Sequence, residues 1–466
     1  MTTVEESIEI GKAARKLVGR RELDHFEPRD DARDPVEIVR AEDATRVPEL
    51  LPIKYGRMLT SPFAFYRGAA ALMAEDLATT PRTDLHAQLC GDAHLSNFGM
   101  FASPERKLVF DLNDFDETLP GPWEWDLKRL VASLVVAMRS IGADDDAGRE
   151  AVRWSVESYR KQMARLAEMR NLDVWYERID VEQIEQVLRE SNDAESLKII
   201  EKTAEKAYTK DSIREFEKLT ELVDGRRRIK ADPPVVVPIE DAIKEYGIED
   251  VSPEEIAARL STIMFGYRES LATDRRHLIE QYDVVHMARK VVGVGSVGTR
   301  VWIVLMIGRD AGDPLFMQVK EAEESVLEPH LGASEFASHG ERVVAGQRLM
   351  QAATDVLLGW DSSVGIDGKP RDFYVRQLKD WKGSLKIEKT SPSSLTRYGG
   401  ACGVALARAH ARSGDRIAIS AYLGKSQHTA DALAEFAVSY ADQNERDYAR
   451  MREAVEDGRI EVIEGV

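Results

Sequence analysis

Two polar segments near each other in the chain carry the residue types that could do chemistry. The first is Gly91-Asp-Ala-His-Leu-Ser-Asn97, in which Asp92 and Asn97 are five residues apart. In enzymes that transfer phosphoryl groups, an aspartate with this spacing accepts a hydroxyl proton and the asparagine holds Mg²⁺. His94 either orients the loop by hydrogen bonds or contacts substrate. The simpler interpretation is a capped turn, because Asp, Asn, Ser and Gly are common turn residues.

The second segment, Phe110-Asp-Leu-Asn-Asp-Phe-Asp-Glu117, ends an apolar run that is typical of a β-strand. Asp111, Asp114 and Asp116 cluster there, and packed carboxylates repel one another unless a cation neutralises them. Asp111 lies fourteen residues after Asn97, close to the interval between the two magnesium ligands of kinases. We therefore predict Asn97 and Asp111 as magnesium ligands, with Asp114 as the next choice, for a second ion.

A glycine-rich stretch, Gly293-Val-Gly-Ser-Val-Gly298, matches G-x-G-x-x-G, which alone is weak evidence for nucleotide binding. A dinucleotide-binding fold would need a helix next, but the β-forming run Val301 to Ile307 follows. The pattern favours a hairpin whose amides cover phosphates, with Lys320 one hairpin later pairing with the α- and β-phosphates. A surface hairpin with an ordinary lysine is the simpler alternative. The predicted phosphate-binding residues are Gly293, Gly295, Ser296, Gly298 and Lys320.

Further residues would support such a site. A lysine of this type needs a carboxylate from the following helix; the candidates are Glu328, Glu335 and Glu341, and we favour Glu341, although a solvated helix-face glutamate is an alternative. Gln377 lies in a predicted strand that would form the adenine-side hinge. Asp126 either caps a helix or holds the backbone of the Asp-Asn loop.

A different chemistry is also possible at the second acidic segment. Asp114-Phe-Asp-Glu-Thr118 has the D-x-D-x-T form of haloacid-dehalogenase-type phosphohydrolases, in which the first aspartate is a nucleophile. That fold requires a doubly wound sheet with strand-helix units downstream, whereas Pro120 and long charged helices follow here. This alternative is therefore the weaker one.

Bulk composition limits the class of protein. The 466 residues carry a formal net charge of −18, which argues against nucleic acid or an anionic membrane as the main partner. Local groups and metal can still bind ATP. Cys90 and Cys402 are the only cysteines, and the N-terminal residues lack the apolar core of a signal peptide. We expect a cytoplasmic protein; the oligomeric state cannot be inferred.

Hydrophobic periodicity predicts long helices around a central β-rich region. Residues 284–320 read as a three-stranded antiparallel meander, with a further strand pair around 373–378. Helices are predicted at about 3–19, 61–77, 123–141, 253–271, 334–358, 398–412 and 429–455, and helical segments over 146–222.

The quoted motifs resemble known families. Gly91 to Asn97 with Phe110-Asp111 is similar to the catalytic and metal segments of aminoglycoside phosphotransferases and related kinase-like small-molecule kinases. Over most of its length the chain resembles an uncharacterised bacterial family, domain of unknown function 2252. The matching stretches are 55–58, 61–68, 91–99, 110–117 and 340–348.

This resemblance implies an α+β, bilobal, protein-kinase-like fold with a circularly permuted order. In ordinary kinases the glycine-rich hairpin and lysine precede the catalytic loop, but here they follow it. The helix at 401–412 resembles the one that normally leads into that loop. We expect a large helical lobe with a helical insertion (1–283), a small β lobe (284–380) and returning large-lobe helices (381–466).

The expected activity is transfer of the ATP γ-phosphoryl group, with Mg²⁺, to a hydroxyl of an unknown small-molecule or protein acceptor. Asp92 would be the base. Arg57, Arg67 and Arg226 to Arg228 could meet an anionic acceptor, although exposed or salt-bridged arginines are the simpler interpretation. Nucleotidyl (AMP) transfer on the same fold and a nucleotide-binding pseudokinase are the open alternatives.

Overall fold

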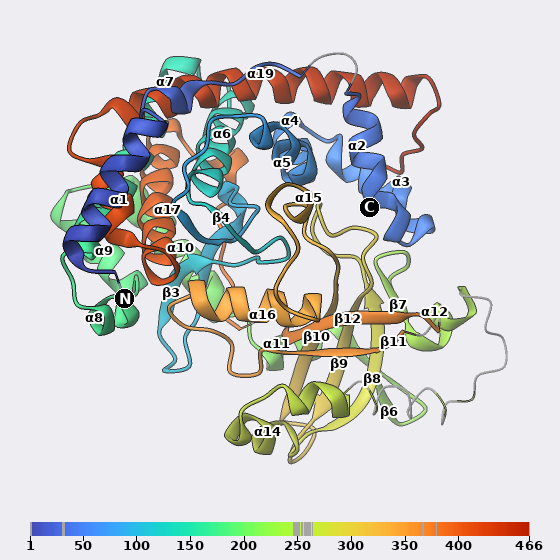
Figure 1. Cartoon of the computed structure of the whole chain (residues 1–466). Coiled ribbons are helices and arrows are strands. Elements are labelled where there is room, and N and C mark those ends of the chain that lie inside the picture. Colours follow the sequence, from blue (N-terminus) through green and yellow to red (C-terminus); the bar gives the residue numbers. More distant parts are fainter. Residues whose placement is uncertain are drawn as a thin grey trace.

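Helices from both ends of the chain form one half of the molecule, and a six-stranded sheet forms the other (Figure 1). The computed structural model describes residues 2–29, 33–245, 264–365, 368–378 and 380–465, together with Ser252, Glu255 and Thr262. The described helices are α1 (Val4–Leu17), α2 (Pro35–Ala41), α3 (Leu51–Met58), α4 (Pro62–Arg67), α5 (Ala70–Ala78), α6 (Glu124–Ser140), α7 (Asp145–Ala167), α8 (Asn171–Tyr176), α9 (Val181–Glu190), α10 (Ala194–Tyr208), α11 (Ser212–Leu219), α12 (Ile239–Glu245), α14 (Thr273–Ile279), α15 (Glu328–Leu331), α16 (His339–Met350), α17 (Pro392–Ser413), α18 (Arg416–Leu423) and α19 (His428–Glu456).

The strands form one large sheet and three two-stranded sheets, β1-β4, β2-β3 and β5-β6, and each described pairing is antiparallel. The large sheet has the order β11-β12-β10-β9-β8-β7. The strands are β1 (His86–Leu89), β2 (Phe98–Ala102), β3 (Leu108–Leu112), β4 (Leu119–Pro122), β5 (Thr220–Val223), β6 (Arg226–Ile229), β7 (Val236–Pro238), β8 (Asp283–Lys290), β9 (Val301–Ile307), β10 (Pro314–Ala322), β11 (Gly359–Val364) and β12 (Pro370–Gln377).

Helix α6 is the centre of the helical half. Its residues from Glu124 to Met138 are all buried, since it is surrounded by α4, α7, α17 and α19. A helix that is apolar on most sides fits only such an interior position. The result is that α6, which directly follows the acidic segment, packs against helices from the far C-terminal part of the chain.

Both faces of the large sheet are covered, which explains its nearly continuous apolar strands. In β9, Val304 and Met306 join one buried cluster with Tyr267, while Ile303 and Leu305 join another with Phe216 of α11. Residues on the two faces of a strand alternate, so the run is buried from both sides.

The mixed α+β class predicted from the sequence is confirmed, as are the β8-β9-β10 meander and the later strand pair β11-β12. The sheet also includes β7, which lies before the expected boundary at 284. The helix predicted over 61–77 is divided into α4 and α5, because the chain leaves helical geometry at Gly68 and Ala69. The helix predicted over 334–358 is shorter, since Ser338 caps α16 and Gln351 is extended.

Of the helix expected over 253–271, residues 253, 254, 256–261 and 263 lie outside the described residues, and 264–269 are helical as predicted. Among the helices that are described, none is long and apolar enough to cross a membrane.

Candidate functional site

The backbone of the loop between β1 and β2 is held by a side chain of α6. Asp126, in the first turn of α6, accepts hydrogen bonds from the N–H groups of Cys90 (2.8 Å) and Gly91 (3.0 Å). Gly91 has φ +84° and a Cβ there would lie 2.3 Å from the Glu117 carbonyl oxygen, so a side chain is excluded. His410 Nε2 lies 3.3 Å from Asp126 Oδ2. Of the two predicted roles for Asp126, support of the loop backbone is the one observed.

Asp92 is oriented by a buried arginine. Arg129 Nε donates to Asp92 Oδ1 at 2.8 Å, and the two side chains are 3% and 20% exposed. Burial raises the pKa of the Asp92 carboxyl, although Arg129 opposes that shift. A carboxyl with a raised pKa accepts a proton more readily, which suits a general base.

His94 and Asn97 complete the loop. His94 is buried and its Nδ1 accepts a hydrogen bond from the Ser96 N–H at 3.1 Å. Burial holds the pKa of His94 well below its usual range, so its Nε2, 3.5 Å from Asp92 Oδ2, carries the ring proton. Asn97 Nδ2 donates to the Asp92 carbonyl oxygen at 2.5 Å, which leaves its amide oxygen available.

Lys320 reaches this loop region from the third strand of the meander. Its Nζ forms an ion pair with Asp116 and donates to Ser296 Oγ at 2.7 Å. Tyr374, opposite Lys320 on β12, donates to the other oxygen of Asp116 at 2.8 Å. Burial alone would lower the pKa of Lys320, but Asp116 outweighs it and the pKa is raised. The lysine is therefore a cation held beside the acidic segment.

The carboxylate that orients Lys320 is Asp116 and not a helix glutamate. Among the described residues, Glu341 makes no ion pair with Lys320; it lies in the first turn of α16, where its N–H donates to Ser338 Oγ at 3.4 Å. Glu328 instead lies 3.7 Å from Arg342. The acidic segment reaches the sheet at Lys320 of β10 and Tyr374 of β12, both of which bond to Asp116.

Asp111 and Asp114 face different surroundings. Asp111 Oδ1 accepts from Arg408 at 2.5 Å and its Oδ2 from the Ala352 N–H at 3.0 Å, and both charged side chains are buried. Asp111 does not line the cleft described below, because its strand position points it toward α17. Asp114 does line it, and its Oδ1 is buried without a hydrogen-bond partner in the described structure. Burial, and then Asp116, raise the pKa of Asp114. Of the two predicted metal ligands, Asp114 is thus the one that faces the cleft, and Asp111 is not.

The glycine-rich loop joins β8 to β9, as predicted, but it is also bound by the N-terminal part of the chain. Arg46 Nη1 donates to the carbonyl oxygens of Gly295 (2.9 Å) and Val297 (2.6 Å). The Val47 N–H donates to the Gly298 carbonyl oxygen at 2.8 Å. Gly298 has φ +94°, a conformation that favours glycine.

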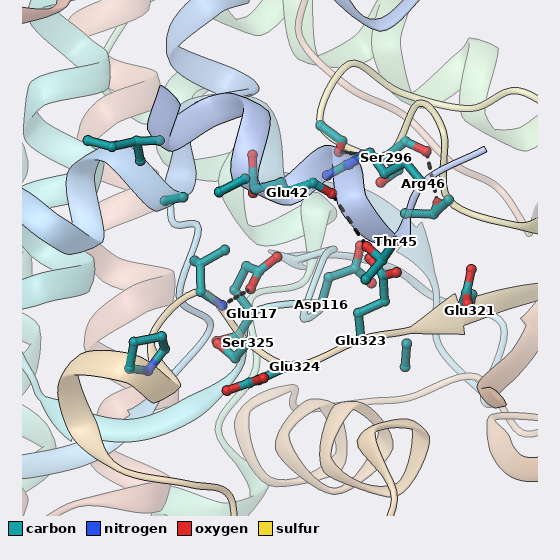
Figure 2. Close-up of a pocket in the computed structure, with 18 of the residues that line it drawn as sticks. Glu42, Thr45, Arg46, Asp116, Glu117, Ser296, Glu321, Glu323, Glu324 and Ser325 are labelled. Carbon is teal, nitrogen blue, oxygen red and sulfur yellow. Dashed lines mark hydrogen bonds between the residues drawn. The ribbon is translucent and has the colours of Figure 1, made fainter. Parts of the chain in front are cut away.

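Two adjoining cavities lie between the loop that joins β1 to β2, which we call the catalytic loop after its predicted role, and this glycine-rich loop. The smaller one, about 90 Å³, is lined by Arg67, Asp92, His94, Asn97, Asp114 and residues 293–296, among others. The larger one, about 630 Å³, shares six lining residues with it: Glu42, Arg46, Asp116, Glu117, Gly295 and Ser296. We call the two together the cleft. In Figure 2, Glu42, Thr45 and Arg46 lie on one side of the larger cavity, opposite Glu323, Glu324 and Ser325.

The predicted residues therefore divide into two groups. The structure brings together Asp92, His94, Asn97, Asp114, Gly293, Gly295 and Ser296 at the smaller cavity, with Lys320 bonded to Asp116 and Ser296 beside it. Gln377 is not among the residues lining the cleft; its N–H and side-chain amide both donate to Asp355. Glu341, Gly298 and Asp111 also lie outside the lining.

Sequence reasoning missed two arginines that organise the site. Arg129 follows Asp126 by three residues on a helix, so both face the same loop, and this spacing is a signal that was available. Arg46 lies in a charged stretch with no motif, and nothing in the sequence points to the glycine-rich loop as its partner.

Magnesium is the metal that the predicted chemistry requires, and the donors here are of the right kind. No group of three or more His, Cys, Asp or Glu side chains able to hold a metal is found in the described part of the chain. Mg²⁺, however, is usually held by one or two carboxylates together with substrate phosphates and water. The Asn97 amide oxygen and the unpartnered oxygen of Asp114 fit that pattern.

Comparison with known proteins gives the family. Residues 46–454 match the model of a family described as "Uncharacterized protein conserved in bacteria", domain of unknown function 2252. The chain belongs to this family. No curated protein and no solved structure matches it. The family carries no assigned activity, so function has to be argued from the cleft.

Proposed function

We propose that this protein is a kinase-like phosphotransferase that uses ATP and magnesium to phosphorylate a hydroxyl. The observation that carries the proposal is the meeting of three distant segments at one cleft. These are the Asp-Asn loop, the acidic segment with Asp114 and Asp116, and the strand that carries Lys320. Kinases use this combination of base, metal ligands and phosphate-binding lysine.

The arrangement around the sheet supports the same proposal. The glycine-rich loop joins the first two strands of the meander and Lys320 lies on the third. Helix α16 follows that strand and precedes β11. A kinase has its glycine-rich loop, its lysine and its orienting helix in this succession. A bilobal kinase-like fold is therefore part of the proposal.

The contact between the end of α17 and the start of β1 supports a circular permutation. In kinases, a helix leads directly into the catalytic loop. Here the Gln88 N–H of β1 donates to Ser413 Oγ at the end of α17 at 3.1 Å, and a Cβ on Gly414 would lie 2.6 Å from the His86 carbonyl oxygen. The end of α17 thus lies against the start of β1, although the two are more than three hundred residues apart. A permuted chain keeps its site because the roles depend on geometry.

The proposed reaction is an in-line displacement. The acceptor oxygen forms a bond to the γ-phosphorus, the bond from that phosphorus to the β–γ bridging oxygen breaks, and ADP leaves. Asp92 takes the hydroxyl proton. Bound Mg²⁺ would neutralise charge on the phosphate oxygens. Lys320 and the glycine-rich loop would hold the phosphates in place, so most of the rate enhancement would come from positioning and charge.

The three alternative functions make different demands on the residues of the cleft. Nucleotidyl transfer would use the same side chains with the nucleotide inverted, so that the α-phosphorus is attacked. A pseudokinase regulator would bind nucleotide without transfer, yet it has no need of Asp92 and Asn97. The phosphohydrolase alternative requires a parallel, doubly wound sheet, whereas every described strand pair is antiparallel, so we do not propose it.

A thermal-shift measurement with magnesium and a panel of nucleotides tests the proposal first. Ligand at a hundred times its dissociation constant adds about 2.7 kcal/mol to the stability of the folded protein, which is a measurable rise in Tm. ATP labelled at the γ or the α position, incubated with a cell extract as the source of acceptor, then separates phosphoryl from nucleotidyl transfer. The absence of a Tm response to every nucleotide would refute the kinase-like function.

A further inference from the structure

Arg67 is the last residue of α4, and α4 is fixed to the catalytic loop through another arginine. Arg129 donates from Nε to Asp92 and from Nη2 to the Tyr66 carbonyl oxygen at 2.7 Å. The Tyr66 hydroxyl in turn donates to the Arg129 carbonyl oxygen at 2.8 Å. The position of Arg67 relative to Asp92 is therefore set by a buried network rather than by its own side chain.

Arg67 lines the smaller cavity, where the nearby carboxylates Asp92 and Glu388 attract its charge. Its Nε is buried without a hydrogen bond, and it forms no ion pair within the described residues. Asp92 is not its direct partner, since one carboxylate oxygen is bonded to Arg129 and the other faces His94. The other arginine of this lining, Arg46, already donates to two carbonyl oxygens.

A guanidinium is costly wherever one of its N–H groups loses hydration without gaining a hydrogen bond, and in Arg67 that group is Nε. Burial lowers the pKa of Arg67, in keeping with that cost. An anion in the cavity would relieve it. Guanidinium groups bind phosphate oxygens with two parallel hydrogen bonds, which makes phosphate the anion best matched to such a site.

The size and walls of the cavity limit which part of a ligand fits there. Its volume of about 90 Å³ is small beside the adjoining cavity of about 630 Å³, which suits a phosphoryl group better than a nucleoside. The glycine-rich loop lies along one wall: a Cβ on Gly295 would lie 3.3 Å from the Arg67 carbonyl oxygen, whereas Gly293 faces open space.

From this geometry, and resting on the proposed phosphotransferase function, we infer that Arg67 binds the phosphoryl group that is being transferred. Its guanidinium donates to non-bridging oxygens of the γ-phosphate while the bond to ADP breaks and the bond to the acceptor oxygen forms. An arginine in this position stabilises the charge of the transition state. Arg67 is therefore assigned as a catalytic residue.

Calorimetric titration of the full chain with MgATP, MgADP and MgAMP tests the assignment. Arg67→Ala should weaken MgATP binding by about tenfold to a hundredfold, the worth of hydrogen bonds to a charged group, and leave MgADP and MgAMP within about threefold. Arg67→Lys should recover part of the MgATP affinity. Because Arg67 makes no hydrogen bond or ion pair within the described residues and only attracts Asp92 and Glu388 electrostatically, the Tm of Arg67→Ala should stay close to that of wild type.

The outcomes separate this inference from the proposed function. Arg153→Ala, an exposed arginine on α7, is the control and should bind all three nucleotides like wild type. Equal weakening of MgATP and MgADP in Arg67→Ala, or no weakening at all, overturns the inference while the kinase-like function stands. If wild type binds no nucleotide, the proposed function itself has failed. If Arg67→Ala does not fold, the ratio of MgATP to MgADP affinity in Arg67→Lys decides.

Discussion

The two sides of the cleft are held in place by different means. On the catalytic-loop side, Asp126, Arg129 and His410 are at most 3% exposed, and each bonds a neighbour of the same network. On the glycine-rich side, the loop accepts hydrogen bonds from Arg46 and Arg57 through its backbone carbonyls. Buried charges are expensive to leave unpaired, whereas bonds from partly exposed side chains contribute little.

This difference has a functional meaning in the proposed reaction. A base and its metal ligands must stay within a few tenths of an ångström of the reacting atoms. A loop over the phosphates must admit and release a nucleotide. We therefore expect changes on the catalytic-loop side to reduce turnover or stability severely, and changes on the glycine-rich side to alter nucleotide affinity modestly.

The largest effect is expected from Asp92→Asn. The asparagine oxygen can still accept from Arg129, but it cannot take a proton, so phosphoryl transfer from γ-labelled ATP should fall about 10²- to 10⁴-fold. MgATP affinity should change little, whereas the Tm should fall, because the buried Arg129 loses its counter-charge. The exposed neighbour Asp84 gives a matched control, and Asp84→Asn should transfer at the wild-type rate. Undiminished transfer by Asp92→Asn would remove Asp92 as the base.

Asp126→Ala should be the most destabilising change. It leaves two backbone N–H groups and His410 without their acceptor inside the protein, which costs about 3–5 kcal/mol. Urea unfolding at constant pH measures this loss.

The control for that experiment is Asp146→Ala, whose side chain is 94% exposed and whose removal should cost less than about 0.5 kcal/mol. An equally small loss for Asp126→Ala would mean that the catalytic loop is held by something other than this network.

A pH effect should arise on the same side of the cleft. Burial raises the pKa of the Glu124 carboxyl to about 7 from 4.5, while its oxygens accept from the Thr83 N–H and hydroxyl. A carboxyl with a higher pKa in the folded than in the unfolded state stabilises fully below about pH 4.5, and that contribution is lost as the pH rises toward 7.

Glu124→Gln has no proton to lose, so its free energy of unfolding should gain on wild type by up to about 3 kcal/mol between pH 5 and pH 8. Urea titrations across that range measure the difference. Glu150→Gln, at an exposed position of α7, should follow the wild-type profile. Parallel profiles for Glu124→Gln and wild type would contradict the assigned pKa.

Much of the site was predictable because its motifs are local. The Asp-Asn loop, the glycine-rich turn and the strand of Lys320 each follow from residue type and spacing within a few tens of residues. That Asp114 rather than Asp111 faces the cleft was not predictable in this way. Asp111 faces Arg408, almost three hundred residues away, and no pattern in β3 reveals which of its faces α17 covers.

The prediction that a helix glutamate pairs with Lys320 was wrong for a related reason. A glutamate from the next helix is the nearest candidate along the chain, but Asp116 is the nearest in space. Its position depends on where the acidic segment reaches the sheet, and that is decided by packing between distant elements. Contacts within a motif are encoded locally, whereas contacts between motifs require the fold.

The smallest effect is expected from Arg46→Ala, on the glycine-rich side. The variant loses two hydrogen bonds to loop carbonyls that water can partly replace, so MgATP affinity should fall only a few-fold, about 1 kcal/mol, with turnover at saturating MgATP nearly unchanged. Arg40→Ala, an exposed arginine of α2, is the control for loss of charge. If Arg46→Ala instead abolishes turnover, the glycine-rich loop must be held as rigidly as the catalytic loop, and the contrast between the two sides of the cleft does not hold.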